Sequence, residues 1–378
     1  MTGGAEKALI NMLRFLDYDK YDVTLWVKDD HGELTPQVDP HVTIRCWGEY
    51  YKQDYKQFLF HLLKKCRFVL AAYSFLCRSL CKYVIRSTYL SYKLSFMSLL
   101  LADQTEYDAA ICYQLLREED VLFLSYGIKA KEKIGWIHGK FSHNRANPLQ
   151  KTFFREYPKL DHIFCVSKDC QALFLQQHPE LLGKTSVMYN LQDFDTIRTL
   201  ANEKVEEDFS GLTLVTVGRL STEKGQDMIP AIAEKLVAQG YQFVWYLVGD
   251  GPTRLKLEQE ITERNLSNTV VLLGTKNNPY PYIRNCSLYV QPSYREGFCV
   301  STFEAKILGA PVVVTDVSGM SEQFSREEAV FCEPDVDSLT EGIDRAIQEQ
   351  RANKTVSYAI PFDFNLRELK KLYEVIEG

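Results

Sequence analysis

The sequence predicts an α/β protein of two Rossmann-like domains, each built on a parallel sheet, and three observations support this. The chain has 378 residues, more than one hydrophobic core usually supports. From residue 105 onward, short apolar runs of β-favouring residues alternate with helical patterns, which is typical of parallel α/β units. Between residues 201 and 208 the chain becomes polar and acidic, which indicates a boundary between two domains.

The strands of both domains are expected from these apolar runs, because strands buried on both faces read as nearly continuous Val, Ile and Leu. A terminal helix is expected over residues 362–378, where leucines recur at helical spacing. We therefore expect an N-terminal domain over 1–190, a C-terminal domain over 191–361, and a last helix that returns to the N-terminal domain. The predicted strands cover residues 109–112, 133–137, 162–166, 212–217, 243–248, 270–273, 288–291 and 312–315.

Composition excludes several classes of protein. Apolar residues make up 46% of the chain and the net charge is −6, so a nucleic-acid partner is not expected. The ten cysteines are scattered through apolar runs, which favours reduced, buried thiols. Cys77 and Cys81 lie four apart without a second pair of ligands, so no metal is expected. The N-terminus lacks the basic and apolar regions of a signal peptide, and we expect a cytoplasmic protein.

A glycine-flanked loop with two cations follows the predicted strand at 212–217. Gly218 and Arg219 lie at the end of that strand, and Lys224 stands just before a helix. In open α/β sheets this edge binds ligands, and an arginine fork with a lysine can hold a diphosphate. A solvated loop with incidental charges is the alternative interpretation.

A second loop runs from the predicted strand at 288–291 into a helix and carries two glutamates. Gly297 and the residues after it would expose backbone N–H groups at the start of the helix, which suits a phosphate. Glu304 could accept hydrogen bonds from ribose hydroxyls, and Glu296 would then face a sugar. Glu304 could instead be a carboxylate favoured by the helix dipole.

The motif Gly-Arg-x4-Lys-Gly at 218–225, followed by Glu-Gly-Phe-x5-Glu at 296–304, resembles family 4 of the retaining glycosyltransferases, which includes bacterial enzymes of capsular and lipid-linked glycan synthesis. Asn190 and the segments 249–252 and 309–314 agree with that pattern. In the N-terminal domain the resemblance covers only residues 3–7 and 136–139.

This resemblance implies the GT-B fold and a nucleotide-sugar donor, with no cofactor and no metal. Arg219 and Lys224 would bind the diphosphate, and Glu304 the ribose. Glu296 and His138 would be catalytic and contact the sugar, although a histidine after a strand can also be purely structural. Gly3 and Gly4 would form a loop on the acceptor side. The remaining donor contacts implied by the resemblance are Gly218, Thr275, Gly297, Phe298, Cys299 and Val300.

The family normally has a buried strand before its Gly-Gly loop, but only Met1 and Thr2 precede Gly3. The first strand of the N-terminal sheet is therefore expected to be missing, either because the start is truncated or because the sheet is rearranged.

Residues 55–100 form a basic, aromatic segment with eight Lys or Arg and no Asp or Glu. Its longest uncharged stretch, 68–77, is too short to span a bilayer. Cations spaced along one helical face favour a helix on anionic lipid headgroups. A solvated basic face over a packed helix is the alternative. The residues expected to contact the membrane are Lys64, Lys65, Arg78, Lys82, Arg86 and Lys93.

The leading hypothesis is a retaining, metal-independent hexosyltransferase that uses a UDP- or GDP-sugar, UDP ahead of GDP. Its acceptor would be a glycan or a polyprenyl-linked glycan at the cytoplasmic face of the membrane, where the protein would be peripherally bound. A catalytically silent nucleotide-sugar-binding subunit of another transferase is the alternative. An NAD-dependent oxidoreductase is disfavoured because no G-x-G-x-x-G follows a predicted strand.

Overall fold

The structure is a computed structural model, and the chain forms two compact units in it. Unit 1 consists of Met1–Val166, Cys170–Leu191 and Asn365–Gly378, and unit 2 consists of Ser167–Asp169 and Gln192–Phe364. The residues that the structure describes are 4–28, 32, 34–46, 68, 72, 75–76, 93, 96–97, 105–115, 118–139, 154–351, 358 and 360–378.

Unit 2 is built on a six-stranded parallel sheet with the strand order β12-β11-β10-β7-β8-β9. Its central strands are fully buried, as their uninterrupted apolar sequences predict. The strands are β7 (Thr213–Val217), β8 (Val244–Val248), β9 (Val270–Gly274), β10 (Leu288–Gln291), β11 (Val312–Thr315) and β12 (Ala329–Cys332).

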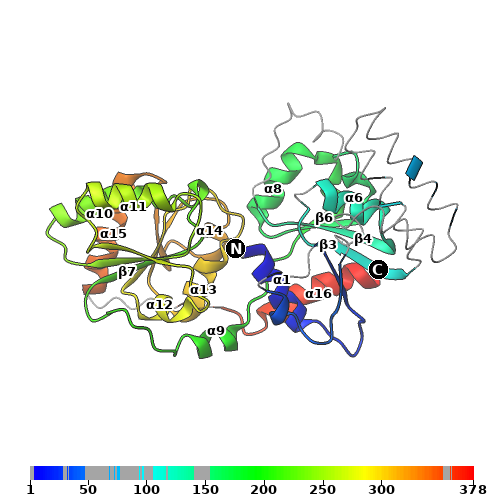
Figure 1. Ribbon diagram of the computed structural model, residues 1–378, viewed down its shortest axis with the longest axis horizontal. Coiled ribbons are helices and arrows are strands. Elements are labelled where there is room, and N and C mark those ends of the chain that lie inside the picture. Colours follow the sequence, from blue (N-terminus) through cyan, green and yellow to red (C-terminus); the bar gives the residue numbers. More distant parts are fainter. Residues whose placement is uncertain are drawn as a thin grey trace. The chain divides into compact units, whose positions relative to one another are not determined.

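Helices cover both faces of this sheet (Figure 1). Side chains alternate along the strands, so Leu214 packs under α10, α11 and α15, whereas Val215 packs under α12, α13 and α14. Unit 2 is therefore a three-layer, doubly wound domain. Its helices are α9 (Phe194–Leu200), α10 (Ile229–Ala238), α11 (Arg254–Glu263), α12 (Tyr280–Asn285), α13 (Val300–Leu308), α14 (Met320–Gln323) and α15 (Val336–Arg351), with 3₁₀ turns at Thr222–Lys224 and Gln226–Met228.

The direction in which successive strands are added to the sheet reverses at β7. Strands β8 and β9 follow β7 on one side, and the chain then crosses to place β10 on the other side. The loops after β7 and β10 leave the same edge of the sheet and diverge, which is where open α/β sheets bind ligands.

Unit 1 contains a four-stranded parallel sheet, β3-β4-β5-β6, and a separate parallel pair, β1-β2. Its core lies between the four-stranded sheet and the helices α6 and α8. The elements are α1 (Gly4–Phe15), β1 (Thr24–Val27), β2 (Thr43–Cys46), β3 (Glu106–Cys112), α6 (Glu118–Tyr126), β4 (Lys129–Ile137), β5 (His162–Cys165), α8 (Lys168–Gln177) and β6 (Thr185–Val187), with 3₁₀ turns at Thr35–Gln37, Tyr157–Lys159 and Pro179–Lys184.

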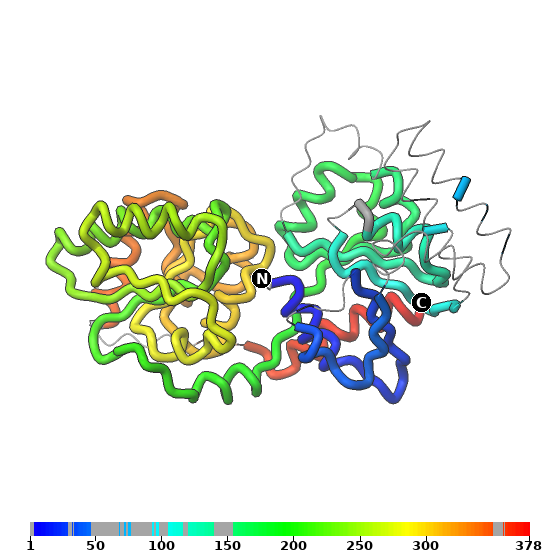
Figure 2. The backbone as a smooth tube through the Cα atoms, in the orientation of Figure 1, coloured from blue at the N-terminus to red at the C-terminus, as the bar shows by residue number. Residues whose placement is uncertain are grey.

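The last helix, α16 (Phe364–Glu377), returns to unit 1 after the chain has completed unit 2. Figure 2 shows its red tube beside the blue N-terminal segments. Its Glu368 carboxylate accepts a hydrogen bond from the N–H of Tyr189 at 2.7 Å, and its Tyr373 hydroxyl accepts one from the N–H of Asp17 at 3.1 Å. The predicted α/β fold with a returning terminal helix is confirmed.

Four of the described strands were not predicted from the sequence, namely β1, β2, β6 and β12. Each has only three or four residues and includes half-buried side chains, so none reads as a continuous apolar run. Among the described residues no strand joins β1 to β3, and the Trp26 indole donates to the Tyr107 hydroxyl at 3.2 Å across that boundary.

The expected loop at Gly3 and Gly4 is corrected in part. Gly4 is the first residue of α1, whose first turn carries Glu6, a favourable charge at a helix N-terminus. Gly3 lies outside the described residues.

Most of the predicted membrane contacts also lie outside the described residues, namely Lys64, Lys65, Arg78, Lys82 and Arg86. Lys93 is described, and its ammonium lies 4.4 Å from the centroid of the Tyr126 ring. Among the helices in the described part of the chain, none combines the length and apolar character needed to cross a bilayer.

The close contact between α15 and β12 yields a test of the unit 2 core. A Cβ atom on Gly342 would lie 2.2 Å from the Cys332 Sγ, so Gly342→Ala should destabilise the unit by about 1–3 kcal/mol despite its higher helix propensity. Removing the sulfur in Gly342→Ala/Cys332→Ala should relieve the clash and restore part of the loss.

Thermal unfolding of these variants would check this. Gly211→Ala is the matched control, because no heavy atom lies within 4 Å of the added Cβ. If the double variant is no more stable than Gly342→Ala, this packing account is wrong.

Candidate functional site

The loops after β7 and β10 pack directly on each other at the edge of the unit 2 sheet. The backbone N–H groups of Tyr294 and Arg295 donate to the Glu223 carbonyl at 3.0 and 3.2 Å. Gly225 lies between the two loops with a φ of 66°, and a Cβ there would lie 2.0 Å from the Pro292 carbonyl oxygen. This close approach requires glycine, because any side chain would force the loops apart.

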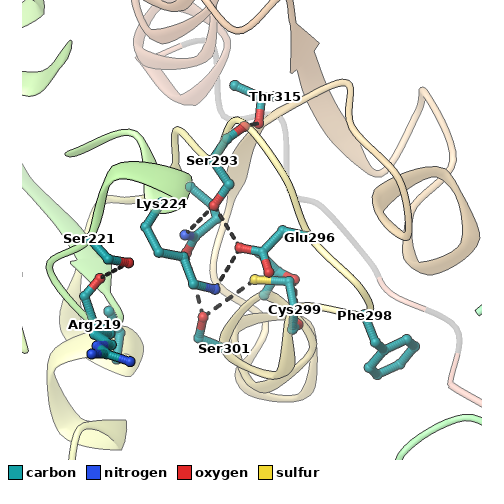
Figure 3. Close-up of polar contacts among 12 residues, drawn as sticks. Arg219, Ser221, Lys224, Ser293, Glu296, Phe298, Cys299, Ser301 and Thr315 are labelled. Atoms are coloured by element: carbon teal, nitrogen blue, oxygen red, sulfur yellow. Dashed lines mark hydrogen bonds and ion pairs between the residues drawn. The ribbon is translucent and has the colours of Figure 1, made fainter. Parts of the chain in front are cut away.

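A buried ion pair joins the two loops. The Lys224 Nζ lies 2.6 Å from the Glu296 Oε1, and the buried Ser293 hydroxyl donates to the same oxygen at 2.6 Å (Figure 3). The Glu296 side chain is 7% exposed and that of Lys224 is 21% exposed. The other carboxylate oxygen, Oε2, accepts no hydrogen bond from the described residues, so it is available to a ligand.

Its surroundings hold Lys224 in the charged form. Burial acts to lower the pKa of Lys224, but the charge and hydrogen bond of Glu296, together with the nearby Cys299 and Glu223, outweigh burial and the pKa is raised. A lysine held as a cation in a partly dehydrated loop is a fixed positive charge that needs no reorganisation when an anion arrives.

Arg219 supplies a second, separate cation. Its side chain is exposed, and its guanidinium makes no ion pair with any described residue. Figure 3 shows this side chain directed away from the Lys224–Glu296 pair. Its backbone is held in place, because the Gln226 carboxamide donates to the Arg219 carbonyl at 3.0 Å. The guanidinium is thus free to meet an anionic ligand.

The turn before α13 carries two backbone N–H groups that no described residue occupies. Cys299 has a φ of 46°, an unusual value for a residue with a side chain, and α13 begins at Val300. The N–H groups of Cys299 and Val300 donate no hydrogen bond within the described part of the chain. Burial raises the pKa of the Cys299 thiol to about 11, so this cysteine is neutral.

Two further predicted residues lie in unit 2. Glu304 is buried within α13, and its carboxylate accepts a hydrogen bond from the Tyr280 hydroxyl at 3.3 Å. Thr275 is exposed directly after β9. The next residue, Lys276, pairs with Glu207 at 3.3 Å and its ammonium lies 5.6 Å from the Tyr282 ring centroid.

His138 follows β4 in unit 1, on the same side of the strand as Trp136. Its ring centroid lies 4.4 Å from that of Tyr113, and burial lowers the pKa of His138 to about 3, so the imidazole is neutral. The His138 Nε2 and the Trp136 Nε1 are buried without a hydrogen-bond partner among the described residues. Unsatisfied buried ring nitrogens are costly and indicate a place for a polar ligand or water.

The structure therefore brings Arg219, Lys224, Glu296 and the turn at 297–300 together at one edge of unit 2, with Glu304 in the following helix. Sequence reasoning missed Ser293, although it lies in the same loop as Glu296. It also missed Gln323, for which no motif gave a signal. In the described part of the chain, no three His, Cys, Asp or Glu side chains are grouped as metal ligands.

Comparison with known sequences shows which family the segment around this site is similar to. Residues 199–361 match the profile of the family described as glycosyl transferases group 1. The gpi3 subunit of phosphatidylinositol N-acetylglucosaminyltransferase from Schizosaccharomyces pombe is 26% identical over 228 residues, which cover 58% of this chain and 46% of the yeast protein.

A Campylobacter jejuni protein, N-acetylgalactosamine-N,N'-diacetylbacillosaminyl-diphospho-undecaprenol 4-alpha-N-acetylgalactosaminyltransferase, is 28% identical over 57% of this chain and 59% of its own length. The chain spans less than half the length of several curated relatives that it matches, including the yeast one.

The similarity in structure extends over the whole chain. The Anabaena protein HepE, solved with UDP and glucose, superposes with a TM-score of 0.66 at 17% identity, over 99% of this chain and 92% of the other. The neighbours are GT-B glycosyltransferases, and the predicted GT-B fold is confirmed.

The buried pair gives a testable energetic signature. Lys224→Met or Glu296→Gln alone should destabilise unit 2 by about 2–4 kcal/mol, since each leaves one charge without its partner. The double variant should recover part of this loss, because neither charge remains. Urea unfolding would measure the coupling. The exposed Lys235–Asp337 pair is the control, and its coupling free energy should stay below about 1 kcal/mol. If the stability losses of the single variants simply add in the double variant at both pairs, the prediction is wrong.

Proposed function

We propose that this chain is a retaining glycosyltransferase that moves a hexose or N-acetylhexosamine from a UDP- or GDP-sugar to a glycan or polyprenyl-linked acceptor. The observation that carries the proposal is the Lys224–Glu296 pair beside the N–H groups of Cys299 and Val300, which donate to no described residue. It lies at the switch point of a Rossmann-like sheet, within the segment that matches the family profile.

The donor diphosphate would be bound by cations and backbone donors together. Arg219 would engage the phosphates with its fork of N–H groups, and Lys224 would act as a fixed point charge. The N–H groups of Phe298, Cys299 and Val300, with Gly218 and Gly297 allowing close approach, would complete the contact at the helix N-terminus. When the glycosidic bond breaks, these groups stabilise the charge on the leaving diphosphate, and we propose that no divalent ion is required.

The nucleoside would lie across the neighbouring loops. Glu304 would accept hydrogen bonds from the ribose hydroxyls, and the Tyr280 hydroxyl holds its carboxylate in position. Thr275 would lie beside the nucleobase. UDP is preferred to GDP in this proposal, and the HepE structure with UDP and glucose supports it.

The sugar would be held by Glu296 and His138. The Glu296 Oε2 would accept from ring hydroxyls, and its negative charge would favour an oxocarbenium-like transition state. Because His138 is neutral, its Nε2 would contact a hydroxyl, such as that on C6, rather than carry a proton through the reaction.

Retention would arise without a protein nucleophile. The acceptor oxygen would attack C1 on the face from which the diphosphate departs, so one C–O bond breaks as another forms on the same side. The acceptor's proton would pass to the departing phosphate oxygen, which keeps the step balanced.

A lipid-linked acceptor is supported by the relatives. The yeast relative belongs to a phosphatidylinositol N-acetylglucosaminyltransferase, and the Campylobacter jejuni relative acts on a diphospho-undecaprenol glycan. Because the yeast relative is one subunit of its enzyme, it also favours one alternative, a catalytically silent nucleotide-sugar-binding partner of another transferase. Capsular polysaccharide synthesis is the pathway class in which we place the enzyme.

We also propose peripheral binding to the cytoplasmic face of an anionic membrane. In the basic segment, Phe68, Ala72, Phe75 and Leu76 are helical and exposed, at a spacing that places them on one face. Phe68 and Leu76 are each 60% exposed. Farther along, Phe96 is buried against Leu122 and Phe123 of α6 in unit 1. We therefore propose a lipid surface that includes Phe68, Ala72, Phe75 and Leu76.

Nucleotide binding and turnover test the enzymatic proposal. UDP should raise the unfolding temperature of the wild type, and a concentration of 100 times Kd adds about 2.7 kcal/mol of stability. Arg219→Ala should weaken UDP binding about tenfold because a charged contact to phosphate is lost. Arg264→Ala is the matched control, since Arg264, directly after α11, pairs with Glu234 of α10 at the protein surface.

Donor hydrolysis separates the enzyme from the silent subunit. Wild type should hydrolyse a UDP- or GDP-sugar slowly, whereas Glu296→Gln should bind UDP and lose turnover. Nucleotide binding without wild-type turnover of any UDP- or GDP-sugar would favour the silent subunit instead.

Membrane binding is tested by sedimentation with vesicles of phosphatidylglycerol and phosphatidylcholine. Phe68→Ser/Leu76→Ser should lower the bound fraction about tenfold or more, because two exposed apolar side chains no longer enter the interface. Reversal of Arg78, Lys82 and Arg86 to Glu should abolish binding. Leu182→Ser/Leu255→Ser, at sites 67% and 80% exposed, is the control and should bind like wild type. Equal binding by all variants would refute the proposal.

A further inference from the structure

Gln323, the last residue of α14, reaches the turn that precedes α13. Its side chain is buried, and its carboxamide nitrogen donates to the carbonyl oxygens of Phe298 and, at 3.3 Å, of Cys299. The Thr302 hydroxyl lies 2.8 Å from the Gln323 Oε1 and donates to it. The two N–H bonds and the oxygen of one carboxamide are thus all used on this turn.

These contacts set the direction of two peptide groups. In a planar trans peptide the C=O and N–H point in opposite directions. The Phe298 carbonyl shares its peptide with the Cys299 N–H, and the Cys299 carbonyl shares its peptide with the Val300 N–H. Gln323 holds the Phe298 carbonyl, and it shares the Cys299 carbonyl with the Thr302 hydroxyl at 2.8 Å and the Phe303 N–H at 3.4 Å. With both carbonyls held on this side, both N–H groups point the other way. Those two N–H groups are the ones without a hydrogen bond among the described residues.

The turn would not hold this geometry easily by itself. Cys299 is in the left-handed region, with φ 46° and ψ 83°, which costs a residue with a Cβ about 1–2 kcal/mol. Its side chain does not cap the helix. The hydrogen bonds from Gln323 therefore offset the strain at Cys299.

Gln323 is itself anchored from the opposite direction. The buried Lys306 of α13 donates to the Gln323 backbone carbonyl and pairs with Glu328 at 3.1 Å. The Lys306 ammonium also lies 5.3 Å from the centroid of the Phe324 ring. At the other end of α14, a Cβ on Gly319 would lie 2.5 Å from the Gly297 carbonyl oxygen, so the two loops are in direct contact. The carboxamide is held on a rigid support.

We infer that Gln323 is a positioning residue that aims the N–H groups of Cys299 and Val300 at the diphosphate of the bound nucleotide. This inference rests on the proposed function. Gln323 touches no phosphate itself and acts through the turn. The role requires a carboxamide, because an ionised carboxylate of the same shape would face two carbonyl oxygens with no proton to donate.

The test is the affinity of Gln323→Glu for UDP, measured by calorimetry between pH 6 and pH 8 and normalised to wild type at each pH. At pH 8 the variant should bind UDP roughly 10- to 100-fold more weakly, since two contacts to a charged group are misdirected. As the pH falls, the new carboxyl gains a proton and can donate to one carbonyl again, so the deficit should narrow. A purely structural role would give no such recovery.

Gln171→Glu is the matched control, because in unit 1 the Gln171 carboxamide likewise donates to a backbone carbonyl, that of Thr185 at 2.9 Å. It should bind UDP like wild type. Thr302→Val is a second variant for the case in which Gln323→Glu fails to fold. It removes the hydroxyl that lies 2.8 Å from both the Gln323 Oε1 and the Cys299 carbonyl oxygen, and it should weaken UDP binding roughly 3- to 10-fold.

Two results would overturn the inference, and they differ. In the first, wild type binds UDP and Gln323→Glu at pH 8 binds UDP within about twofold of wild type. Thr302→Val takes its place if Gln323→Glu does not fold. In that case Gln323 does not aim the turn, and the proposed function stands. If wild type binds neither UDP nor GDP, the proposed function fails and the inference fails with it.

Discussion

The carboxylate of Glu296 is the group on which the rest of the site depends. Its Oε1 accepts from both Lys224 and Ser293, which ties the loop after β7 to the loop after β10. Burying the Glu296 carboxylate without a partner would cost free energy, and so would burying the Lys224 ammonium without one. Only because the two charges compensate each other can a fold place a dehydrated cation at the edge of its sheet. The close approach at Gly225 then brings the loops near enough for the pair to form.

The fold was largely predictable because its central strands are buried on both faces. The runs at 288–291 and 312–315 were predicted with the bounds that the structure has, since an apolar run between turn signals leaves few alternatives. The strands β1 and β12 could not be predicted in the same way. They are four residues long, and their half-buried side chains give no clear pattern.

The residues of the candidate site could be named from the sequence, but not their mutual arrangement. Arg219 and Lys224 are expected from the sequence to act alike as phosphate ligands. In the structure, Lys224 pairs with Glu296, whereas Arg219 pairs with none of the residues that the structure describes. Lys224 and Glu296 are 72 positions apart, and only the strand order brings them together. The left-handed turn at Cys299 and its support by Gln323 had no local signal, because neither residue type suggests that conformation.

The return of α16 to unit 1 has a consequence for the order in which the protein is made. Glu368 and Lys371 bond to the backbone at Tyr189 and Val187, so unit 1 lacks these contacts until residues 365–378 have left the ribosome. By then every strand of unit 2 has already been synthesised. Unit 1 therefore begins before unit 2 along this chain and gains its contacts with α16 at β6 only after the strands of unit 2 have been made.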